Sequence, residues 1–186
     1  MAIVLVFETH SITVDNERGI ATGWLPGELS EQGRSLARDL GQRYQSTDLA
    51  EVFTSDLRRA VHTAEIAFAE TNVPIRLDPR LRECNYGALN GMPVEDLAAL
   101  RRQHIETPFP GGQSYREVID QTRSFLHDLS VGGDNRTVLV IAHSANKWAL
   151  DCLLNGMHLE DLVDAPFGWQ AGWQYFVAAD RVIDNA

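Results

Sequence analysis

Two histidines stand close behind the two most apolar stretches of the chain. His10 comes shortly after the run 3–7, and His143 directly follows the run 138–142. An unprotonated imidazole nitrogen is a nucleophile, and a protonated imidazole is a cation for an anionic substrate. One histidine in a loop is more often a solvated or capping residue, so the pair is the stronger signal. The four other histidines lie in or near predicted helices and are interpreted as structural: His62, His104, His127 and His158.

Arg59 and Glu83 are two charged residues that could also carry chemistry. Arg59 falls in the first turn of a predicted helix, where free N–H groups and the helix dipole already favour an anion. A guanidinium there adds a bidentate donor for phosphate or carboxylate, although a surface arginine is the alternative interpretation. Glu83 lies in a mixed polar and apolar loop and is a further candidate, although a solvated carboxylate is the alternative interpretation.

Other catalytic signatures are missing from the sequence. It holds no Gly-rich phosphate loop of the P-loop or dinucleotide type, no HExxH and no CxxC. Cys84 and Cys152 fit no metal-ligand spacing and no disulfide framework. We therefore predict no metal and no cofactor, and two reduced thiols, which suit a cytoplasmic protein.

Strands and helices must position the candidate residues. The runs 3–7 and 138–142 are short, β-branched and without alternation, which is typical of strands covered on both faces. Weaker strand patterns lie at 51–54, 75–77 and 173–178. Ser30 is a candidate N-cap for a helix that buries Leu36, Leu40 and Tyr44. Further helices are predicted over 57–68, 94–102, 114–129 (with a capping box) and up to the stop at Gly156.

This alternation predicts a three-layer α/β/α sandwich with a mostly parallel central sheet, built as a single domain over residues 1–186. In such sheets ligands bind beyond the carboxyl ends of the strands. The segments to search are therefore 8–23, 55–59 and the chain from His143 onward.

The composition restricts the partners. Sixteen basic and 26 acidic residues give a formal net charge of −10, which argues against nucleic acid or an anionic membrane as the main partner. No run reaches the roughly 18 apolar residues of a membrane helix. The apolar start 1–7 is too short for a signal-peptide core and lacks a basic leader.

Taken together, these segments resemble the histidine phosphatase superfamily, or phosphoglycerate-mutase-like family, over nearly the whole chain. His10 and Asn16 keep the spacing of the family's first motif, with Thr13 at its Ser/Thr position. Further similar segments follow in the family's order at 22–33, 55–64, 81–91, 110–114 and 138–143. The resemblance implies the phosphoglycerate-mutase-like fold and a histidine acid phosphatase-type enzyme that hydrolyses phosphate monoesters.

The resemblance also implies a role for each site residue. His10 attacks phosphorus and becomes a phosphohistidine that water hydrolyses, while Glu83 protonates the leaving oxygen. His143, as imidazolium, and Arg59 hold the phosphoryl oxygens. The remaining phosphate-binding groups are Asn16, Thr22 and Gly23. The ligand is then a small cytosolic phosphate ester.

The chain departs from the family's Arg-His-Gly motif, because it reads Thr9-His10-Ser11. Losing a charge-assisted hydrogen bond costs roughly 1.5–3 kcal/mol, or about tenfold to over a hundredfold in rate. We expect the Thr9 and Ser11 hydroxyls, or the Lys147 ammonium, to compensate. Glu8 would repel a dianion, so we predict that it points away from the site or binds a cation.

Alternatives to a phosphatase remain. The missing arginine favours a weakened phospho-ligand-binding or interaction module, whereas the retained nucleophile and acid disfavour it. A phosphoglycerate-type mutase is a third option, against which Cys84-Asn85 stands in place of the family's basic pair. A homodimer is left open. Some aromatic residues are candidates for an apolar specificity pocket or for the core: Trp24, Tyr86, Trp148, Trp169 and Trp173.

Overall fold

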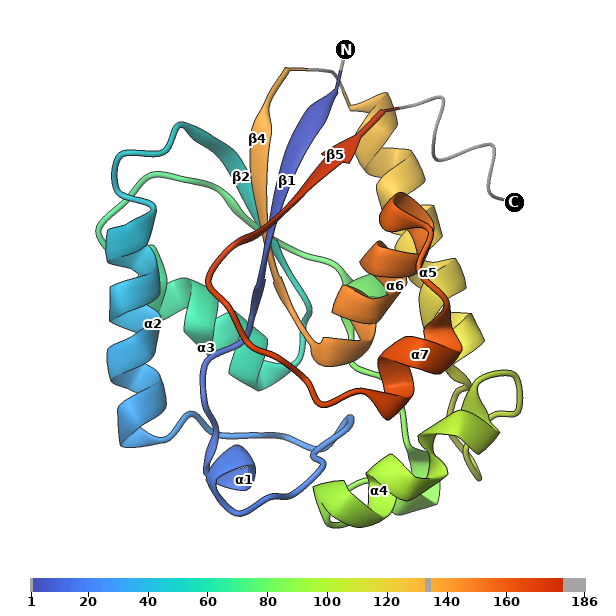
Figure 1. Ribbon diagram of the computed structural model, residues 1–186. Coiled ribbons are helices and arrows are strands. Elements are labelled where there is room, and N and C mark those ends of the chain that lie inside the picture. Colours follow the sequence, from blue (N-terminus) through green and yellow to red (C-terminus); the bar gives the residue numbers. More distant parts are fainter. Residues whose placement is uncertain (1, 133–134, 179–186) are drawn as a thin grey trace.

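A sheet of five strands forms the centre of the computed structural model, which describes residues 2–132 and 135–178 (Figure 1). The strands lie in the order β3-β2-β4-β1-β5. Three of the four pairings in this part of the chain are parallel, and β5 runs antiparallel to β1. The strands, all of them predicted, are β1 (Ile3–Thr9), β2 (Leu49–Thr54), β3 (Ile75–Leu77), β4 (Thr137–Ala142) and β5 (Trp173–Val177).

The register of the sheet brings three strand ends to one level. Thr9 at the end of β1 lies opposite Ala142 at the end of β4, and Thr54 of β2 lies opposite Ile141. The His10 N–H then donates to the Ala142 carbonyl at 2.9 Å. Three segments distant in sequence thus leave the sheet side by side.

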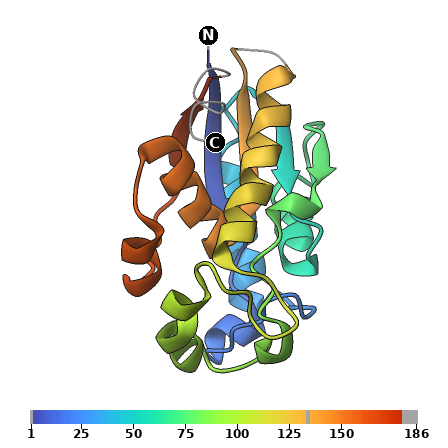
Figure 2. The same cartoon turned by 90° about the vertical axis from the view of Figure 1, so that its right-hand side faces the viewer.

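Helices cover both faces of the sheet. α2 and α3 lie on one side, and α5, α6 and α7 lie on the other (Figures 1 and 2). This arrangement confirms the predicted three-layer fold with a mostly parallel sheet. The helices are α1 (Val14–Glu17), α2 (Glu31–Arg43), α3 (Arg58–Ala67), α4 (Val94–Leu100), α5 (Tyr115–Val131), α6 (Ser144–Asn155) and α7 (Leu159–Asp164).

Alternate residues of the central strands build two separate apolar cores. On β4, Val138 and Val140 pack with α5 and α6, whereas Leu139 and Ile141 pack with Leu40 of α2 and with α3. Every one of these strand residues is at most 1% exposed. Burial on both faces explains why the sequence of β4 is continuously apolar instead of alternating.

The predicted helix ends are confirmed where capping residues mark them. The Ser30 hydroxyl accepts the Gly33 N–H at 3.1 Å and starts α2. Ser114 and Glu117 form the capping box of α5, and Gly156 ends α6 in the left-handed conformation.

Three features differ from the sequence prediction. Leu36 is 36% exposed instead of buried, whereas Leu40, one turn later, is 3% exposed. The helix predicted over 94–102 changes to a 3₁₀ turn at Arg101–His104. α1 and α7 were not predicted, because four and six residues are too short to show an apolar stripe.

The polar connections and short helices lie beyond the carboxyl ends of the parallel strands. α1 and α4 are found there, below the sheet in Figures 1 and 2. Within residues 2–132 and 135–178, none of the helices has both the length and the apolar character to cross a membrane.

Gly41 supplies a test of the contact between α2 and α3. A Cβ atom at Gly41 would lie 2.0 Å from the Ala67 carbonyl oxygen. Alanine favours a helix by up to about 1 kcal/mol over glycine, but a backbone clash of this kind costs about 1–3 kcal/mol. We therefore expect Gly41→Ala to lower the free energy of unfolding, measured by urea titration.

Gly168→Ala is the control, because its Cβ atom would meet nothing within 4 Å. It should change the free energy of unfolding by less than about 0.5 kcal/mol. Equal stability of both variants would contradict the close α2–α3 approach.

Candidate active site

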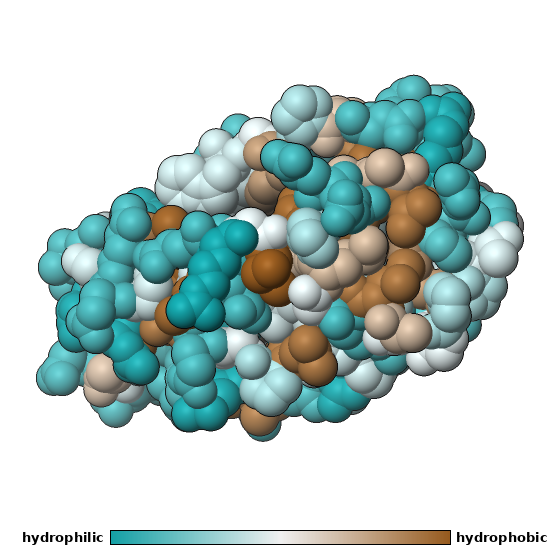
Figure 3. Space-filling model, turned by 90° about the horizontal axis from the view of Figure 1, so that it is seen from below, coloured by the Kyte–Doolittle hydropathy of each residue, from teal (hydrophilic) through white to brown (hydrophobic). Residues whose placement is uncertain are grey.

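A cavity of about 580 Å³ lies at the carboxyl ends of β1 and β4, and His10, Arg59 and Glu83 line it. The His143 ring lies beside His10, with 5.0 Å between the ring centroids. Figure 3 views this end of the molecule from below and shows apolar side chains exposed among polar ones. The four candidate residues that the sequence analysis singled out therefore meet at one place.

Two hydrogen bonds hold the His10 ring. Nδ1 lies 2.7 Å from the Ser11 carbonyl oxygen, so Nδ1 carries the proton and donates it. Nε2 accepts from Arg59 Nε at 3.2 Å and is therefore unprotonated. Burial and the Arg59 cation lower the pKa of His10 to about 3. The ring is neutral, with a lone pair beside the guanidinium.

Arg59 is a buried cation in the first turn of α3. The residue as a whole is only 2% exposed. The guanidinium donates to the Gly23 carbonyl at 2.8 Å, to the Leu25 carbonyl at 3.4 Å and to His10. It forms no ion pair within the described chain. Burial lowers the pKa of Arg59 and the Glu83 carboxylate opposes this, but a guanidinium stays charged.

His143 precedes α6 and is 1% exposed. Its Nε2 lies 2.7 Å from the Ser55 hydroxyl, and its Nδ1 lies 3.4 Å from Arg59 Nη2. Burial, Arg59 and His10 together lower the pKa of His143 well below its usual value. A second cation is unfavourable beside Arg59, so the imidazolium that the resemblance implies requires a bound anion.

Glu83 is 7% exposed and is held from both sides. Its Oε1 accepts the Cys84 N–H at 2.8 Å, and its Oε2 accepts the Ser144 hydroxyl at 3.0 Å. The Trp24 indole N–H donates to the Glu83 carbonyl at 2.6 Å. These hydrogen bonds hold the carboxyl group in the wall of the cavity that His10 also lines.

The predicted phosphate-binding groups have different surroundings. Asn16 lines the cavity, its Oδ1 accepts from the Thr13 backbone and hydroxyl, and its Nδ2 donates to no group of the described chain. The Thr22 hydroxyl donates to Asp15 at 2.8 Å and is therefore engaged, although Thr22 and Gly23 both line the cavity. Gly23 has φ +54°, and a Cβ atom there would overlap the Asn90 side chain.

Two of the three expected compensating groups are engaged elsewhere. The Ser11 hydroxyl donates to the Gly33 carbonyl at 2.6 Å. Lys147 pairs with Asp151, and its Nζ lies 5.2 Å from the centroid of the Trp173 ring. Neither the Ser11 hydroxyl nor Lys147 is available to a ligand, against our expectation. Thr9 does line the cavity.

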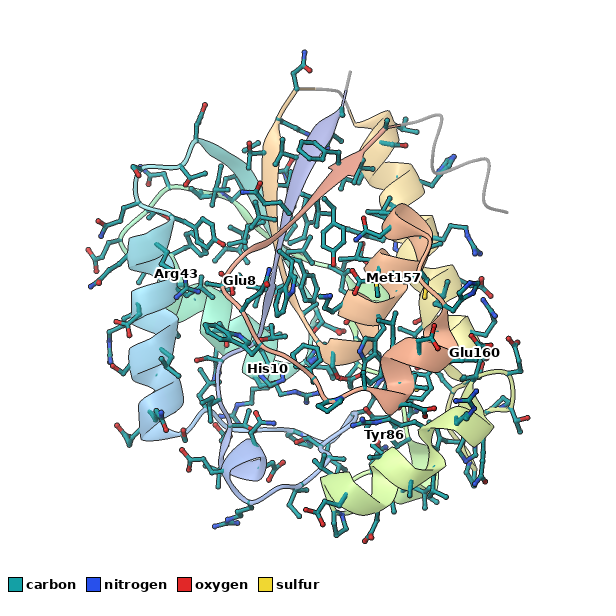
Figure 4. The ribbon with its side chains drawn as sticks, viewed as in Figure 1. Glu8, His10, Arg43, Tyr86, Met157 and Glu160 are labelled. Carbon is teal, nitrogen blue, oxygen red and sulfur yellow. The ribbon has the colours of Figure 1, made fainter. Side chains whose placement is uncertain are left out.

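Glu8 binds a cation, as predicted. Arg43 Nη2 and the Tyr44 hydroxyl both donate to Glu8 Oε1 at 2.8 Å, and Glu8 is 1% exposed. Figure 4 shows Glu8 and Arg43 next to each other, with His10 further along toward the site. The ion pair keeps a full negative charge from facing a bound anion.

Sequence reasoning missed two arginines that line the cavity, Arg43 and Arg101. The Arg101 guanidinium lies 5.3 Å from the centroid of the Trp148 ring. Arg43 follows Leu36 and Leu40 at helical spacing, which was the one available signal. Of the five aromatic candidates, Tyr86, Trp148 and Trp169 line the cavity, whereas Trp24 and Trp173 do not.

No group of three or more metal-ligating side chains occurs in the described ranges.

Comparison with known proteins relates this site to phosphate-ester enzymes. The chain is 31% identical over 166 residues to phosphoserine phosphatase 1 of Hydrogenobacter thermophilus, covering 84% of this chain and 78% of the relative. It is 27% identical over 197 residues to a 2,3-bisphosphoglycerate-dependent phosphoglycerate mutase of Nitrobacter winogradskyi, covering 97% and 94%.

Solved structures give the same relationship. A mycobacterial glucosyl-3-phosphoglycerate phosphatase superposes with a TM-score of 0.80 at 27% identity, covering 94% of this chain and 90% of that one. A structure named mycobacterial hydrolase 1 gives 0.82 at 26% identity, covering 95% and 91%. The sequence model of the histidine phosphatase superfamily (branch 1) matches residues 5–174. The chain therefore belongs to the histidine phosphatase superfamily, among relatives named as phosphatases and mutases.

Proposed function

We propose that this chain hydrolyses a phosphate monoester of a small cytosolic metabolite through a phosphohistidine on His10. The observation that carries the proposal is Arg59, a buried cation that forms no ion pair with the described residues and donates to the lone pair of a neutral imidazole. Such a cation is costly unless an anion binds there, and a phosphate ester carries about two negative charges. The free thiols Cys84 and Cys152 support a reducing compartment.

In the first step, the lone pair of His10 Nε2 forms the N–P bond and the bond from phosphorus to the ester oxygen breaks. Glu83 gives its proton to that oxygen, so the leaving group departs as an alcohol. The Ser11 carbonyl, which accepts the Nδ1 proton at 2.7 Å, stabilises the positive charge that develops on the ring. General acid catalysis of this kind contributes roughly 10²–10⁴-fold.

In the second step, a water molecule attacks phosphorus and gives a proton to the Glu83 carboxylate. The N–P bond breaks, the lone pair returns to His10 and inorganic phosphate leaves. Throughout, the Arg59 cation neutralises charge on the equatorial oxygens, and the Asn16 amide donates a hydrogen bond to them. The Gly23 carbonyl accepts from Arg59 and holds the guanidinium in place. A bound dianion also favours a proton on His143, which then becomes a second cation.

The nucleophile assignment is tested with His10→Ala. We expect phosphate release from a metabolite panel to fall at least about a thousandfold, because no other side chain is proposed to form the intermediate. The control is His127→Ala, which removes a histidine whose side chain is 58% exposed. Rapid mixing with a radiolabelled ester, stopped in alkali, should trap phosphohistidine in the wild type and in His127→Ala but not in His10→Ala.

Two outcomes would change this assignment. A tight phosphate-ester complex without covalent label would indicate a binding module instead. Transfer of the phosphoryl group to a second position of 3-phosphoglycerate, without phosphate release, would indicate a mutase.

The acid role of Glu83 is tested by changing the leaving group. Glu83→Gln should lower kcat/KM about a hundredfold or more for alkyl phosphates, which need a proton on the leaving oxygen. It should lower kcat/KM less than tenfold for p-nitrophenyl phosphate, whose phenolate leaves unprotonated. Equal losses for both substrates would show that Glu83 acts otherwise than as an acid.

The neutral state of His10 has a consequence for stability. The folded pKa of about 3 lies below the unfolded value of 6.5, so stability is lost as pH falls through this window. Between pH 7 and pH 5 this contributes about 2 kcal/mol to the decline in unfolding free energy. His10→Gln should show a decline that is smaller by this amount in urea titrations. His127→Gln should follow the wild type, and an unchanged decline in His10→Gln would refute the low pKa.

A further inference from the structure

The cavity extends beyond the phosphate-binding groups into an apolar part. Leu36 and Leu40 of α2 line it, as do Phe167 and Trp169 of the connection from α7 to β5. Figure 1 shows this connection passing from α7 back across the sheet toward the start of β5. We call the region lined by these four residues the apolar arm.

Exposed large hydrophobic side chains of the described chain are concentrated in the apolar arm. Of eight large hydrophobic side chains that are exposed, three belong to the arm: Leu36 at 36%, Phe167 at 39% and Trp169 at 60%. Leu36 belongs to the helical stripe that was expected to face the core. Apolar side chains exposed together inside a cavity of about 580 Å³ are typical of a ligand site.

In the described part of the chain, the arginines that line the cavity leave no unpaired cation for a group bound in the apolar arm. Three arginines line the cavity in the described part of the chain. Arg59 faces the phosphate position, Arg43 is paired with Glu8, and Arg101 lies over the Trp148 ring. A carboxylate placed in the arm would lose its water without gaining an unpaired cation, which is unfavourable.

This inference rests on the proposed function. We infer that the preferred substrate is a phosphate monoester whose leaving group is uncharged, apolar and at least as large as one aromatic ring. The phosphoryl group lies at Arg59 and His10, and the leaving group packs between Leu36, Leu40 and Trp169. The arm thus selects the substrate, and Trp169 is a specificity residue that takes no part in the bond changes.

The test compares 2-naphthyl phosphate, with an apolar leaving group, and 3-phosphoglycerate, with a small charged one. The wild type should prefer 2-naphthyl phosphate at least about tenfold in kcat/KM. Trp169→Ala and Leu36→Gln should each lower kcat/KM for 2-naphthyl phosphate about tenfold, mainly through KM. Both variants should change kcat/KM for 3-phosphoglycerate less than twofold.

Phe176→Ala is the matched control, because Phe176 is an aromatic residue that is 62% exposed and does not line the cavity. It should leave both substrates unchanged. A wild-type preference for 3-phosphoglycerate, or equal losses in Phe176→Ala and Trp169→Ala, would overturn the inference while leaving the phosphatase proposal intact.

If no probe releases phosphate, the proposed function fails, and calorimetric binding of 2-naphthyl phosphate still decides about the arm. Binding that is about tenfold weaker in Trp169→Ala and unchanged in Phe176→Ala supports the arm. Equal binding by the wild type and Trp169→Ala overturns it.

Discussion

The site depends on a buried positive charge that forms no ion pair in the described part of the chain. Arg59 is 2% exposed, and its hydrogen-bond partners are two carbonyls and two imidazoles, all of them neutral. Taking a charge out of water without a counter-ion costs several kcal/mol, which the rest of the fold must supply. A bound dianion relieves this cost, so the donors are already in place before the substrate arrives.

The same charge sets the state of both histidines. Arg59 donates to His10 and lies beside His143, and its field lowers the pKa of each. A neutral His10 keeps the lone pair that attack on phosphorus requires. The neutral His143 of the structure and the cationic His143 of the proposed mechanism are compatible, because a bound dianion would reverse the electrostatic balance.

Local patterns predicted the sheet, the helix caps and the strand ends, and these are what bring His10, Arg59 and His143 together. The structure differs from the sequence prediction at Lys147 and Leu36. Lys147 pairs with Asp151 one turn along its own helix, and this i,i+4 spacing was a signal that the sequence did hold. Leu36 lies outside the core because its turn of α2 borders the cavity, which depends on tertiary contacts that no spacing in the sequence encodes. Glu8 was predictable because a carboxylate near a dianion must be neutralised.

Thr9 and the apolar arm are connected through the energetics of binding. An arginine at Thr9 would contribute roughly 1.5–3 kcal/mol to phosphate binding. Burying about 100 Å² of apolar leaving group at about 25 cal/mol per Å² contributes a similar amount. The two contributions are not equivalent, because packing on the leaving group acts on the ground state and the transition state alike. The arm can therefore restore affinity for the proposed substrate, whereas in the proposed mechanism the rate of phosphoryl transfer still depends on Arg59 and on the charge that a bound dianion would induce on His143.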